Sequence, residues 1–260
     1  MVDVSVVIPY YNGENTISQS LQSICEQTFI PREVIIIDDC SVDKKVLSDI
    51  VVPFSKKLNI RLHSLSENRG AAYARNMGVA LSSSSLIAFL DSDDVWHPKK
   101  IEVQYKFMLE SNAHISAHYY IQNVNLKKME SSDIIKSKRI KKINFLIGNP
   151  FFTPTVMIKR DMVMFNPKYR VVDDYCCWLE NIKRGPAFLI KIPLAGGFKA
   201  AIGASGLTGN IANMHESYKI VLKDLYYKKE ISFSFLFSAY ILENLKYPLR
   251  ILKCYYLKWF

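Results

Sequence analysis

The first hundred residues alternate between short apolar runs and stretches of helical periodicity, and this alternation constrains the fold more than any other feature. The apolar runs span residues 2–9, 33–38 and 86–90, and residues 60–64 are predicted to form a short further strand. Between them, apolar side chains recur at helical spacing in residues 14–27, 46–52 and 70–81. Strands that are apolar along their whole length are typical of parallel sheets covered on both faces. The pattern therefore predicts an α/β fold with a Rossmann-like, mainly parallel central sheet and helices on both faces.

The second half has a weaker pattern. It predicts a helix from Pro98 to about residue 111, strands at 116–124 and 155–158, and a helix at 173–184. A glycine-rich stretch follows at 196–209. Residues 125–142 are polar and basic, which predicts a mobile surface segment; a phosphate-binding loop is the alternative.

The net charge of the chain indicates which kinds of molecule are expected to bind it. The chain has 34 Lys and Arg residues against 24 Asp and Glu residues, a formal net charge of +10. This favours an anionic partner, namely nucleic acid, an acidic membrane surface or a phosphorylated substrate. The basic residues cluster at 125–142 and near the C-terminus, without the pattern of an RRM, KH or helix-turn-helix domain, so no nucleic acid is expected.

The cysteines and the first residues indicate the compartment. The five cysteines show neither a CxxC pair nor a metal-ligand spacing, and their odd number argues against a disulfide framework. The N-terminus has no basic segment followed by a long apolar one, so no signal peptide is expected. Both features favour a cytoplasmic protein.

Polar clusters follow three of the predicted strands. Residues 9–12 (PYYN), 38–39 (DD) and 91–94 (DSDD) each come directly after an apolar run. In open parallel sheets, ligands bind outside the carboxyl ends of the strands. A single acidic loop is usually a solvated turn, but two acidic clusters at one sheet edge indicate a binding site.

The segment FLDSDDVW, residues 89–96, places three aspartates within four positions. In an extended segment, residues i and i+2 share a face, so Asp91 and Asp93 would point to one spot and Ser92 would face away. Hard divalent cations bind one or two carboxylates together with substrate phosphates. We therefore expect Mn²⁺ or Mg²⁺ at Asp91 and Asp93, with Asp94 in a capping or hydrogen-bonding role.

Five segments together resemble the inverting family 2 glycosyltransferases, which have the GT-A fold. They are SVVIPYYNGENTISQSLQSICEQTF (5–29), EVIIIDDCSVD (33–43), ENRGAAYARNMGVA (67–80), IAFLDSDDVWHPKKI (87–101) and VDDYCCWLENIKRG (172–185). They occur in the order and spacing of that family. The resemblance implies a GT-A domain over residues 1–230, with a nucleotide-binding half at 1–110 and an acceptor-binding half at 111–230.

The resemblance also implies roles on the donor side. Asp39 would pair with the uracil edge of a UDP-sugar, and Arg75 would lie near the nucleotide or its diphosphate; a helix-surface arginine is the alternative. Asp93 matches the direct metal ligand, and Asp91 would lie nearer the ribose. The residues expected to bind the nucleotide sugar are Pro9, Tyr10, Tyr11, Asn12, Asp39, Arg75, Asp91 and Ser92.

The catalytic base is implied by an acidic pair that family members carry before an aromatic residue and a tryptophan. Here the segment is DDYCCW, residues 173–178, in which Asp174 takes the base position and Asp173 is the alternative. A sugar hydroxyl is a poor nucleophile, so a placed carboxylate must accept its proton. Asp173 replaces the usual glutamate, and two cysteines replace an acidic-aliphatic pair. Trp178 is expected on the acceptor side.

Residues 198–219 resemble a segment of bacterial O-antigen and polysaccharide glycosyltransferases. That resemblance implies a UDP-hexose donor, galactose or glucose, and an amino sugar linked through pyrophosphate to undecaprenol as acceptor. Ser205 and Thr208 would line the acceptor side, unless they only cap a glycine-rich loop. Other acceptors of the same enzyme class would be capsule, lipooligosaccharide core or a protein glycan.

The C-terminal segment, residues 231–260, predicts attachment to a membrane. Residues 231–242 are uncharged and aromatic but too few to span a bilayer. Beyond them, apolar residues occupy the other helical faces and Pro248 predicts a kink, while one face carries Glu243, Lys246, Arg250 and Lys253. A basic, aromatic, amphipathic helix indicates peripheral binding to the cytoplasmic face of the inner membrane. The alternatives are a helix packed against the domain or, in another class, a non-catalytic membrane or nucleic-acid-binding protein.

Overall fold

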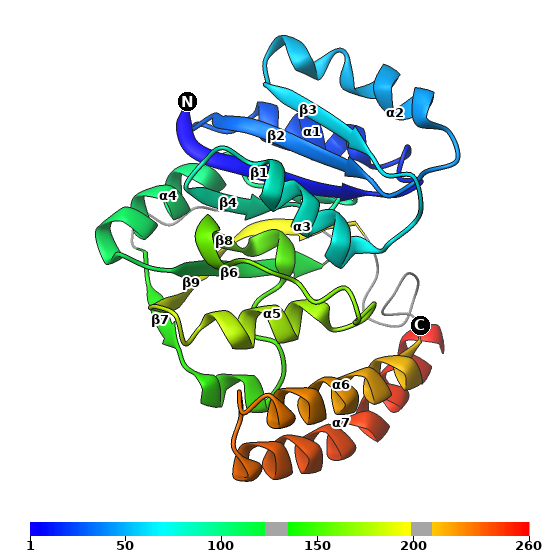
Figure 1. The fold of residues 1–260 in the computed structure, drawn as a ribbon, viewed down its shortest axis with the longest axis vertical. Coiled ribbons are helices and arrows are strands. Elements are labelled where there is room, and N and C mark those ends of the chain that lie inside the picture. Colours follow the sequence, from blue (N-terminus) through cyan, green and yellow to red (C-terminus); the bar gives the residue numbers. More distant parts are fainter. Residues whose placement is uncertain (123–134, 199–209, 260) are drawn as a thin grey trace.

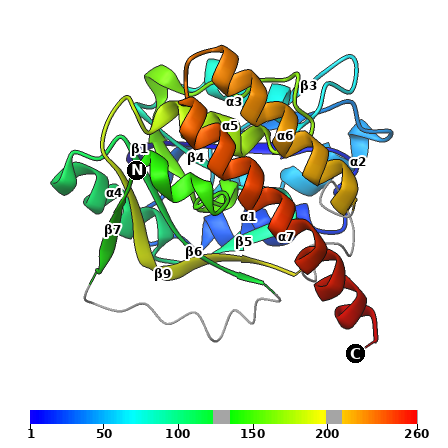
Figure 2. The same ribbon diagram turned by 90° about the horizontal axis from the view of Figure 1, so that it is seen from below.

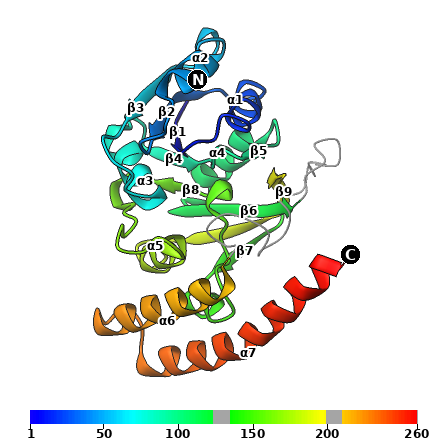
Figure 3. The ribbon, with the colours of Figure 1, turned by 90° about the vertical axis from the view of Figure 1, so that its right-hand side faces the viewer.

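The computed structural model describes residues 1–122, 135–198 and 210–259. These residues form a nine-stranded sheet with the strand order β3-β2-β1-β4-β8-β6-β9-β5, and β7 pairs with β9 (Figure 1). Helices lie against both faces of this sheet (Figure 3). The α/β class predicted from the strand and helix pattern is confirmed.

The N-terminal half is a parallel sheet. Its strands are β1 (Val2–Tyr10), β2 (Pro31–Asp38), β3 (Ile60–Ser64) and β4 (Leu86–Phe89), and all three pairings between them are parallel. The connections carry α1 (Ile17–Cys25), α2 (Lys44–Val51) and α3 (Ala71–Leu81). As Pro53 predicts, α2 stops before it, and a short 3-10 helix, η1 (Phe54–Lys56), follows.

The second half mixes strand directions. It contains β5 (Asp94–Trp96), α4 (Lys100–Ser111), β6 (Ile115–Gln122), β8 (Met157–Lys159) and β9 (Ala187–Gly197). β8 is antiparallel to both β4 and β6, β6 is parallel to β9, and β5 is antiparallel to β9. The parallel character expected for the sheet thus belongs to its first half. Short 3-10 helices, η4 (Thr153–Thr155) and η5 (Arg160–Met162), flank β8.

The prediction of a mobile segment at residues 125–142 is wrong for the last part of that segment. Ser137–Ile140 form β7, antiparallel to β9, and Lys142–Leu146 form the 3-10 helix η3. The backbone of this polar stretch pairs with a strand edge, while Ile140 is buried and the three preceding side chains stay exposed. Residues 125–134 of that prediction, and 199–209 of the glycine-rich stretch, lie outside the described residues.

The core has two main parts, one on each face of the sheet. Side chains of α1, α2 and α4, such as Leu21, Leu47 and Ile101, pack on one face. On the other face, side chains of α3 and α5 (Asp173–Asn181) join those of the last two helices, α6 (Ile211–Tyr227) and α7 (Phe233–Trp259). Burying both faces explains why β1, β2 and β4 are rich in apolar residues, whereas β3, at the sheet edge, has mostly exposed side chains.

Helices α6 and α7 form a hairpin beside α5 (Figures 1 and 2). Phe235 and Ala239 bury the first half of α7 in the core, and α7 continues through Pro248 instead of ending there. Lys246 and Arg250 of this helix turn inward to Glu243, because that carboxylate is buried and needs partners. Among the described residues, no helix is long and apolar enough to cross a bilayer.

Candidate active site

Both acidic motifs line one cavity of about 470 Å³. Asp91, Asp93 and Asp94 reach it from the turn that follows β4, and Asp173 and Asp174 reach it from the first turn of α5. The two motifs are about eighty residues apart in sequence. The strand-end rule located the first motif, and tertiary packing brings the second to it.

The segment after β4 is a turn and not an extended strand. The backbone N–H of Asp94 donates to the carbonyl of Asp91 at 3.1 Å, so the alternation expected for Asp91, Ser92 and Asp93 does not occur. The turn nevertheless directs Asp91 and Asp93 to the same cavity. Ser92 does not line that cavity; a Cβ atom added at Gly13 would lie 3.1 Å from its hydroxyl.

Asp94 has a structural hydrogen bond. Its Oδ1 accepts from the Tyr120 hydroxyl at 2.6 Å, and Tyr120 stacks on Phe152 with ring centroids 5.2 Å apart. Helix capping, the other role considered for Asp94, does not occur, because α4 has Lys99 at its N-cap. The Asp94–Tyr120 pair thus forms one wall of the cavity.

Arg75 of α3 joins the two acidic motifs. Its Nη2 bonds Asp91 at 2.9 Å and its Nη1 bonds Asp173 at 3.1 Å. The side chain is buried, not on a helix surface. Burial disfavours its charge, but the carboxylates of Asp91 and Asp173 outweigh that effect and raise the pKa of Arg75 above its usual value. A buried guanidinium between two carboxylates fixes the relative position of the two acidic motifs.

Asp174 has different partners from Asp173. The Asn149 amide donates to its Oδ2 at 2.8 Å, and the backbone N–H of Tyr175 donates to its Oδ1 at 2.7 Å. Burial, with the neighbouring charge of Asp173, raises the pKa of Asp174 to about 7. A carboxyl group that titrates near neutral pH suits general base catalysis. Because Asp173 bonds Arg75 instead, the geometry favours Asp174 as the base.

The predicted nucleotide-binding corner forms at the ends of β1 and β2. The Asp39 carboxylate accepts the backbone N–H groups of Arg69 at 2.7 Å and Gly70 at 2.8 Å. The backbone N–H of Asn12 donates to the Ser41 hydroxyl at 2.9 Å. Gly70 has φ +87°, a conformation that favours glycine, where the chain enters α3. Asp39 therefore orders the loop before α3.

Exposure differs among the residues of this corner, and its members do not line the cavity that contains Asp174. Tyr10 is buried, whereas Tyr11 is 52% exposed and offers an aromatic ring to a ligand. Pro9 continues β1 and pairs with Ile37 of β2. The corner and the cavity thus occupy neighbouring positions along one sheet edge, at the ends of β1, β2 and β4.

Two expectations for the acceptor side change with the structure. Trp178 is 0% exposed and packs between Phe89 and Phe165, with ring centroids 5.9 and 5.2 Å away. It is therefore a core residue without a surface for an acceptor, because α5 turns that face toward β4. Ser205 and Thr208 lie outside the described residues.

Other cavity residues were not found from the sequence. Asn149, Tyr218 and Arg250 line the cavity with Asp174, yet they come from a loop, from α6 and from α7. A glycine with φ +139° precedes Asn149, so the segment Gly148-Asn149-Pro150 has the composition of a turn. Tyr218 and Arg250 have no such local signal, because their helices are joined to the site only by packing.

Asp91 and Asp93 are the residues expected to bind a divalent cation. Within residues 1–122, 135–198 and 210–259, no group of three or more His, Cys, Asp or Glu side chains could hold a metal. Magnesium and manganese sites in transferases commonly use one or two carboxylates plus substrate phosphates. Asp91 and Asp93, two hard oxygen donors in one cavity, fit such a site.

Comparison with known proteins shows the family of this chain. Residues 5–166 match the family described as glycosyl transferase family 2. A UDP-Glc:α-D-GlcNAc-diphosphoundecaprenol β-1,3-glucosyltransferase, WfgD, of Escherichia coli is 35% identical over 185 residues, covering 69% of this chain and 70% of the relative. A putative teichuronic acid biosynthesis glycosyltransferase, TuaG, of Bacillus subtilis is 33% identical over 194 residues, covering 70% and 73%.

Longer relatives also exist. An uncharacterized glycosyltransferase of Rickettsia felis is 32% identical over 245 residues, and this chain spans only 38% of its length.

Solved structures share the fold at low identity. TarS of Staphylococcus aureus in complex with UDP-GlcNAc superposes with a TM-score of 0.66 at 19% identity, covering 86% of this chain and 66% of that one. The mannosyltransferase PcManGT of Pyrobaculum calidifontis, with GDP-Man and Mn²⁺, has a TM-score of 0.66 at 17% identity, covering 92% and 69%. The GT-A fold is thereby confirmed, and with the family match over most of its length the chain belongs to glycosyl transferase family 2.

Proposed function

We propose that this glycosyltransferase is a metal-dependent, inverting hexosyltransferase that uses a UDP-sugar. The observation that carries the proposal is the Arg75 bridge between Asp91 and Asp173. The bridge ties Asp91, one of two aspartates suited to a metal-bound diphosphate, to Asp173, the neighbour of the carboxyl group of Asp174, whose pKa is about 7, and all of these residues line one cavity. An inverting transfer needs these two functions on opposite sides of one anomeric carbon.

On the donor side, Asp93 and Asp91 would hold a Mn²⁺ or Mg²⁺ ion with the diphosphate of the nucleotide sugar. When bound, the ion supplies Lewis acid stabilisation of the departing diphosphate. Arg75 keeps Asp91 in place through its hydrogen bond. Tyr11 and Asp39 at the neighbouring corner would contact the uridine, with the exposed Tyr11 ring as a stacking surface.

On the acceptor side, Asp174 would remove the proton from the acceptor hydroxyl. As that oxygen bonds the anomeric carbon, the bond from that carbon to the diphosphate breaks and its electron pair leaves with UDP. One displacement inverts the configuration at the anomeric carbon. Asn149 and the Tyr175 backbone N–H orient the Asp174 carboxylate for this transfer.

For the substrates, we propose glucose or galactose as the donor sugar and an amino sugar linked through diphosphate to undecaprenol as the acceptor. The glucosyltransferase activity for which the E. coli relative is named supports this pair. The B. subtilis and Erwinia amylovora relatives, with names from teichuronic acid and amylovoran biosynthesis, support a role in polysaccharide assembly. A capsular, core-oligosaccharide or protein-glycan acceptor is the alternative within the same reaction class.

A lipid-linked acceptor requires access to a membrane surface, and α7 offers a face for it. Its outer side carries apolar side chains at helical spacing, each 45–65% exposed: Phe233, Phe237, Ile241, Leu245, Leu249 and Leu252. We define these six residues as the apolar stripe. An apolar helix face of this kind binds the boundary between lipid headgroups and acyl chains. We therefore propose peripheral attachment to the cytoplasmic face of the inner membrane through the apolar stripe.

The enzyme assay tests the reaction directly. A panel of UDP- and GDP-sugars is incubated with a synthetic diphosphate-linked amino sugar, and the product linkage is read by NMR. We expect a β-linked hexose from an α-linked UDP-hexose, and no transfer by an Asp93→Ala variant that melts like the wild type. Retained α configuration in the product would contradict the inverting mechanism, and equal activity with EDTA would contradict the metal.

Vesicle co-sedimentation tests the attachment. Replacing Leu245, Leu249 and Leu252 by serine should release the protein from vesicles while its melting temperature stays unchanged, because these side chains are exposed. Unchanged sedimentation of this variant would rule out the apolar stripe as the attachment face.

A further inference from the structure

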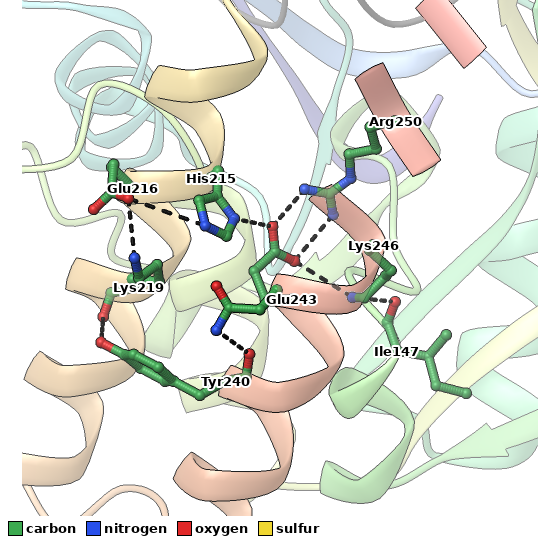
Figure 4. A network of polar contacts seen from close by, with 9 residues as sticks. Ile147, His215, Glu216, Lys219, Tyr240, Glu243, Lys246 and Arg250 are labelled. Carbon is green, nitrogen blue, oxygen red and sulfur yellow. Dashed lines mark hydrogen bonds and ion pairs between the residues drawn. The ribbon is translucent and has the colours of Figure 1, made fainter. Parts of the chain in front are cut away.

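Glu243 of α7 is a buried carboxylate that the proposed reaction does not use. It is 3% exposed, and basic groups surround it (Figure 4). Both Nη atoms of Arg250 bond its two oxygens, Lys246 lies 3.4 Å from Oε2, and His215 Nδ1 lies 3.3 Å from Oε1. One carboxylate thus faces an arginine, a lysine and a histidine, so basic groups outnumber it.

The contacts of Arg250 hold its guanidinium in one orientation. The paired bonds to Glu243 fix the plane of the group, and its carbon lies 5.7 Å from the ring centroid of Tyr218. A guanidinium has five N–H donors, and Glu243 accepts two of them. An arginine oriented in this way presents its remaining donors as a planar fork, the geometry that matches phosphate oxygens.

Arg250 also lines the cavity that contains Asp174, together with Met214 and Tyr218. Lys246 belongs to the same cluster but does not line the cavity; it donates to the carbonyl of Ile147 at 3.0 Å. The cavity wall formed by the turn after β4 is acidic, and Arg75 there bonds two aspartates. Arg250 therefore brings a positive charge to the cavity from α7, and not from the acidic turn after β4.

Helix α7 connects this cation to the apolar stripe. Arg250 points inward and the apolar stripe points outward from the same helix. An acceptor with a sugar, a diphosphate and a lipid has its phosphates between the reacting hydroxyl and the lipid. Arg250 lies on the helix that carries the apolar stripe and also lines the cavity that contains Asp174. It therefore lies where the phosphates of such an acceptor would pass.

We propose that Arg250 is the phosphate-binding residue of the acceptor subsite and that Glu243 is its positioning residue. The inference rests on the proposed function, since it specifies the phosphate-bearing acceptor of that site. Arg250 contacts the diphosphate of the acceptor, and Glu243 holds the guanidinium in the orientation that makes the contact bidentate.

The test compares two acceptors that differ only in the diphosphate. One is an amino sugar with an alkyl diphosphate, and the other is the same alkyl glycoside without phosphate. For Arg250→Ala, we expect a 10- to 100-fold loss of kcat/KM with the diphosphate acceptor, mostly in its KM. The KM for the UDP-sugar and the activity with the phosphate-free acceptor should stay within about twofold of the wild type. An equal loss with both acceptors would overturn the proposal and show a structural role.

Matched variants separate the phosphate contact from stability and from charge. Lys246→Ala removes the same charge from the same helix, and we expect the preference for the diphosphate acceptor to remain. Glu243→Gln keeps the shape and should reduce that preference less than Arg250→Ala does, provided circular dichroism shows a folded protein. If Lys246→Ala lost the preference for the diphosphate acceptor and Arg250→Ala kept it, the assignment of the phosphate contact to Arg250 would be wrong.

Two further measurements keep the outcomes distinct. Binding to phosphatidylglycerol and phosphatidylcholine vesicles should be unchanged by Arg250→Ala; selective loss on phosphatidylglycerol would make Arg250 a lipid-headgroup contact and overturn the acceptor assignment. If the wild type transfers no sugar to either acceptor, the proposed function fails. Calorimetric binding of the diphosphate sugar to wild type and Arg250→Ala then still decides the role of Arg250, since equal affinities would overturn it.

Discussion

In the N-terminal half, Asp39 and Asp91 lie directly behind the ends of parallel strands, whereas in the C-terminal half Asn149, Asp174 and Arg250 come from a loop, a helix N-terminus and the last long helix. The first arrangement follows from the geometry of a parallel sheet, which collects its strand ends at one edge. The second depends on how separate helices pack against that sheet. The proposed donor side is thus set by local structure, and the proposed acceptor side by packing.

Arg75 connects the two arrangements. It begins on α3 of the parallel half, bonds Asp91 of that half and reaches Asp173 of the other. Because Arg75 links the two halves, a substitution in one half can be tested for its effect on the other. The substitutions follow in order of expected effect, beginning with Asp174.

The largest expected effect is on chemistry at the C-terminal side. Asp174→Asn should lower kcat by about 10²- to 10⁴-fold, because the amide cannot accept the proton of the acceptor hydroxyl. UDP-sugar binding, measured by calorimetry, should be unchanged, because Asp174 would contact the acceptor hydroxyl and not the nucleotide. Asp173→Asn is the comparison: turnover lower in this variant than in Asp174→Asn would reverse the assignment of the base.

The next effect tests the bridge itself. Arg75→Met should destabilise the fold by about 3–5 kcal/mol, because it leaves two carboxylates without their buried partner. For a chain of this size each kcal/mol corresponds to about 2–4 °C in melting temperature, read by calorimetry.

Arg69→Met is the matched control for the bridge. Arg69 is also an arginine at the start of this region, but its side chain is 48% exposed, so its melting temperature should match the wild type. Similar melting temperatures for the Arg75 and Arg69 variants would mean that the two halves are not coupled through Arg75.

A smaller effect is expected at the cavity wall. A Cβ atom at Gly197 would lie 2.2 Å from the Tyr120 hydroxyl and 2.3 Å from Asp94 Oδ1. Gly197→Ala should therefore cost about 1–3 kcal/mol in urea unfolding. Adding Tyr120→Phe removes one of the two crowded atoms and should recover part of that loss. If the double variant is as unstable as the sum of the single ones, the crowding explanation is wrong.

The smallest effect concerns pH. Because the pKa of Asp174 is about 7, activity should rise with pH through neutrality as the carboxylate ionises. Asn149 donates to that carboxylate and favours its ionised form, so Asn149→Ala should raise the apparent pKa by up to about one unit. The pH profile of kcat/KM measures this shift. A profile that moves to lower pH would contradict the role of Asn149.

Stability should show the opposite trend. The folded-state pKa of Asp174 lies above its ordinary value of 3.8, so between these two values the native state binds more protons than the unfolded state. The contribution of Asp174 to stability therefore falls as pH rises from about 4 to about 7. In Asp174→Asn this decline should be absent, so its melting temperature should exceed that of the wild type at pH 8 and not at pH 4.

The DSDD segment, residues 91–94, shows what a sequence pattern can predict and what it cannot. The apolar run before it correctly predicted β4 and a polar cluster at the sheet edge. The extended geometry assumed for Asp91 and Asp93 was wrong, because a hydrogen bond between Asp94 and Asp91 closes a turn. Trp178 was similarly expected to contact a substrate, whereas packing against Phe89 and Phe165 buries it.

The sequence by itself determined the α/β class, the strands and helices of the first half and the two acidic motifs, because periodicity and strand-end positions are local properties of the chain. Tertiary structure decided which groups meet: Arg75 with Asp91 and Asp173, Asn149 with Asp174, and Arg250 with Glu243. It also decided that Lys246 and Arg250 of α7 turn inward and the apolar stripe outward. Those outcomes depend on burying charges with partners across long separations in sequence, which local patterns do not specify.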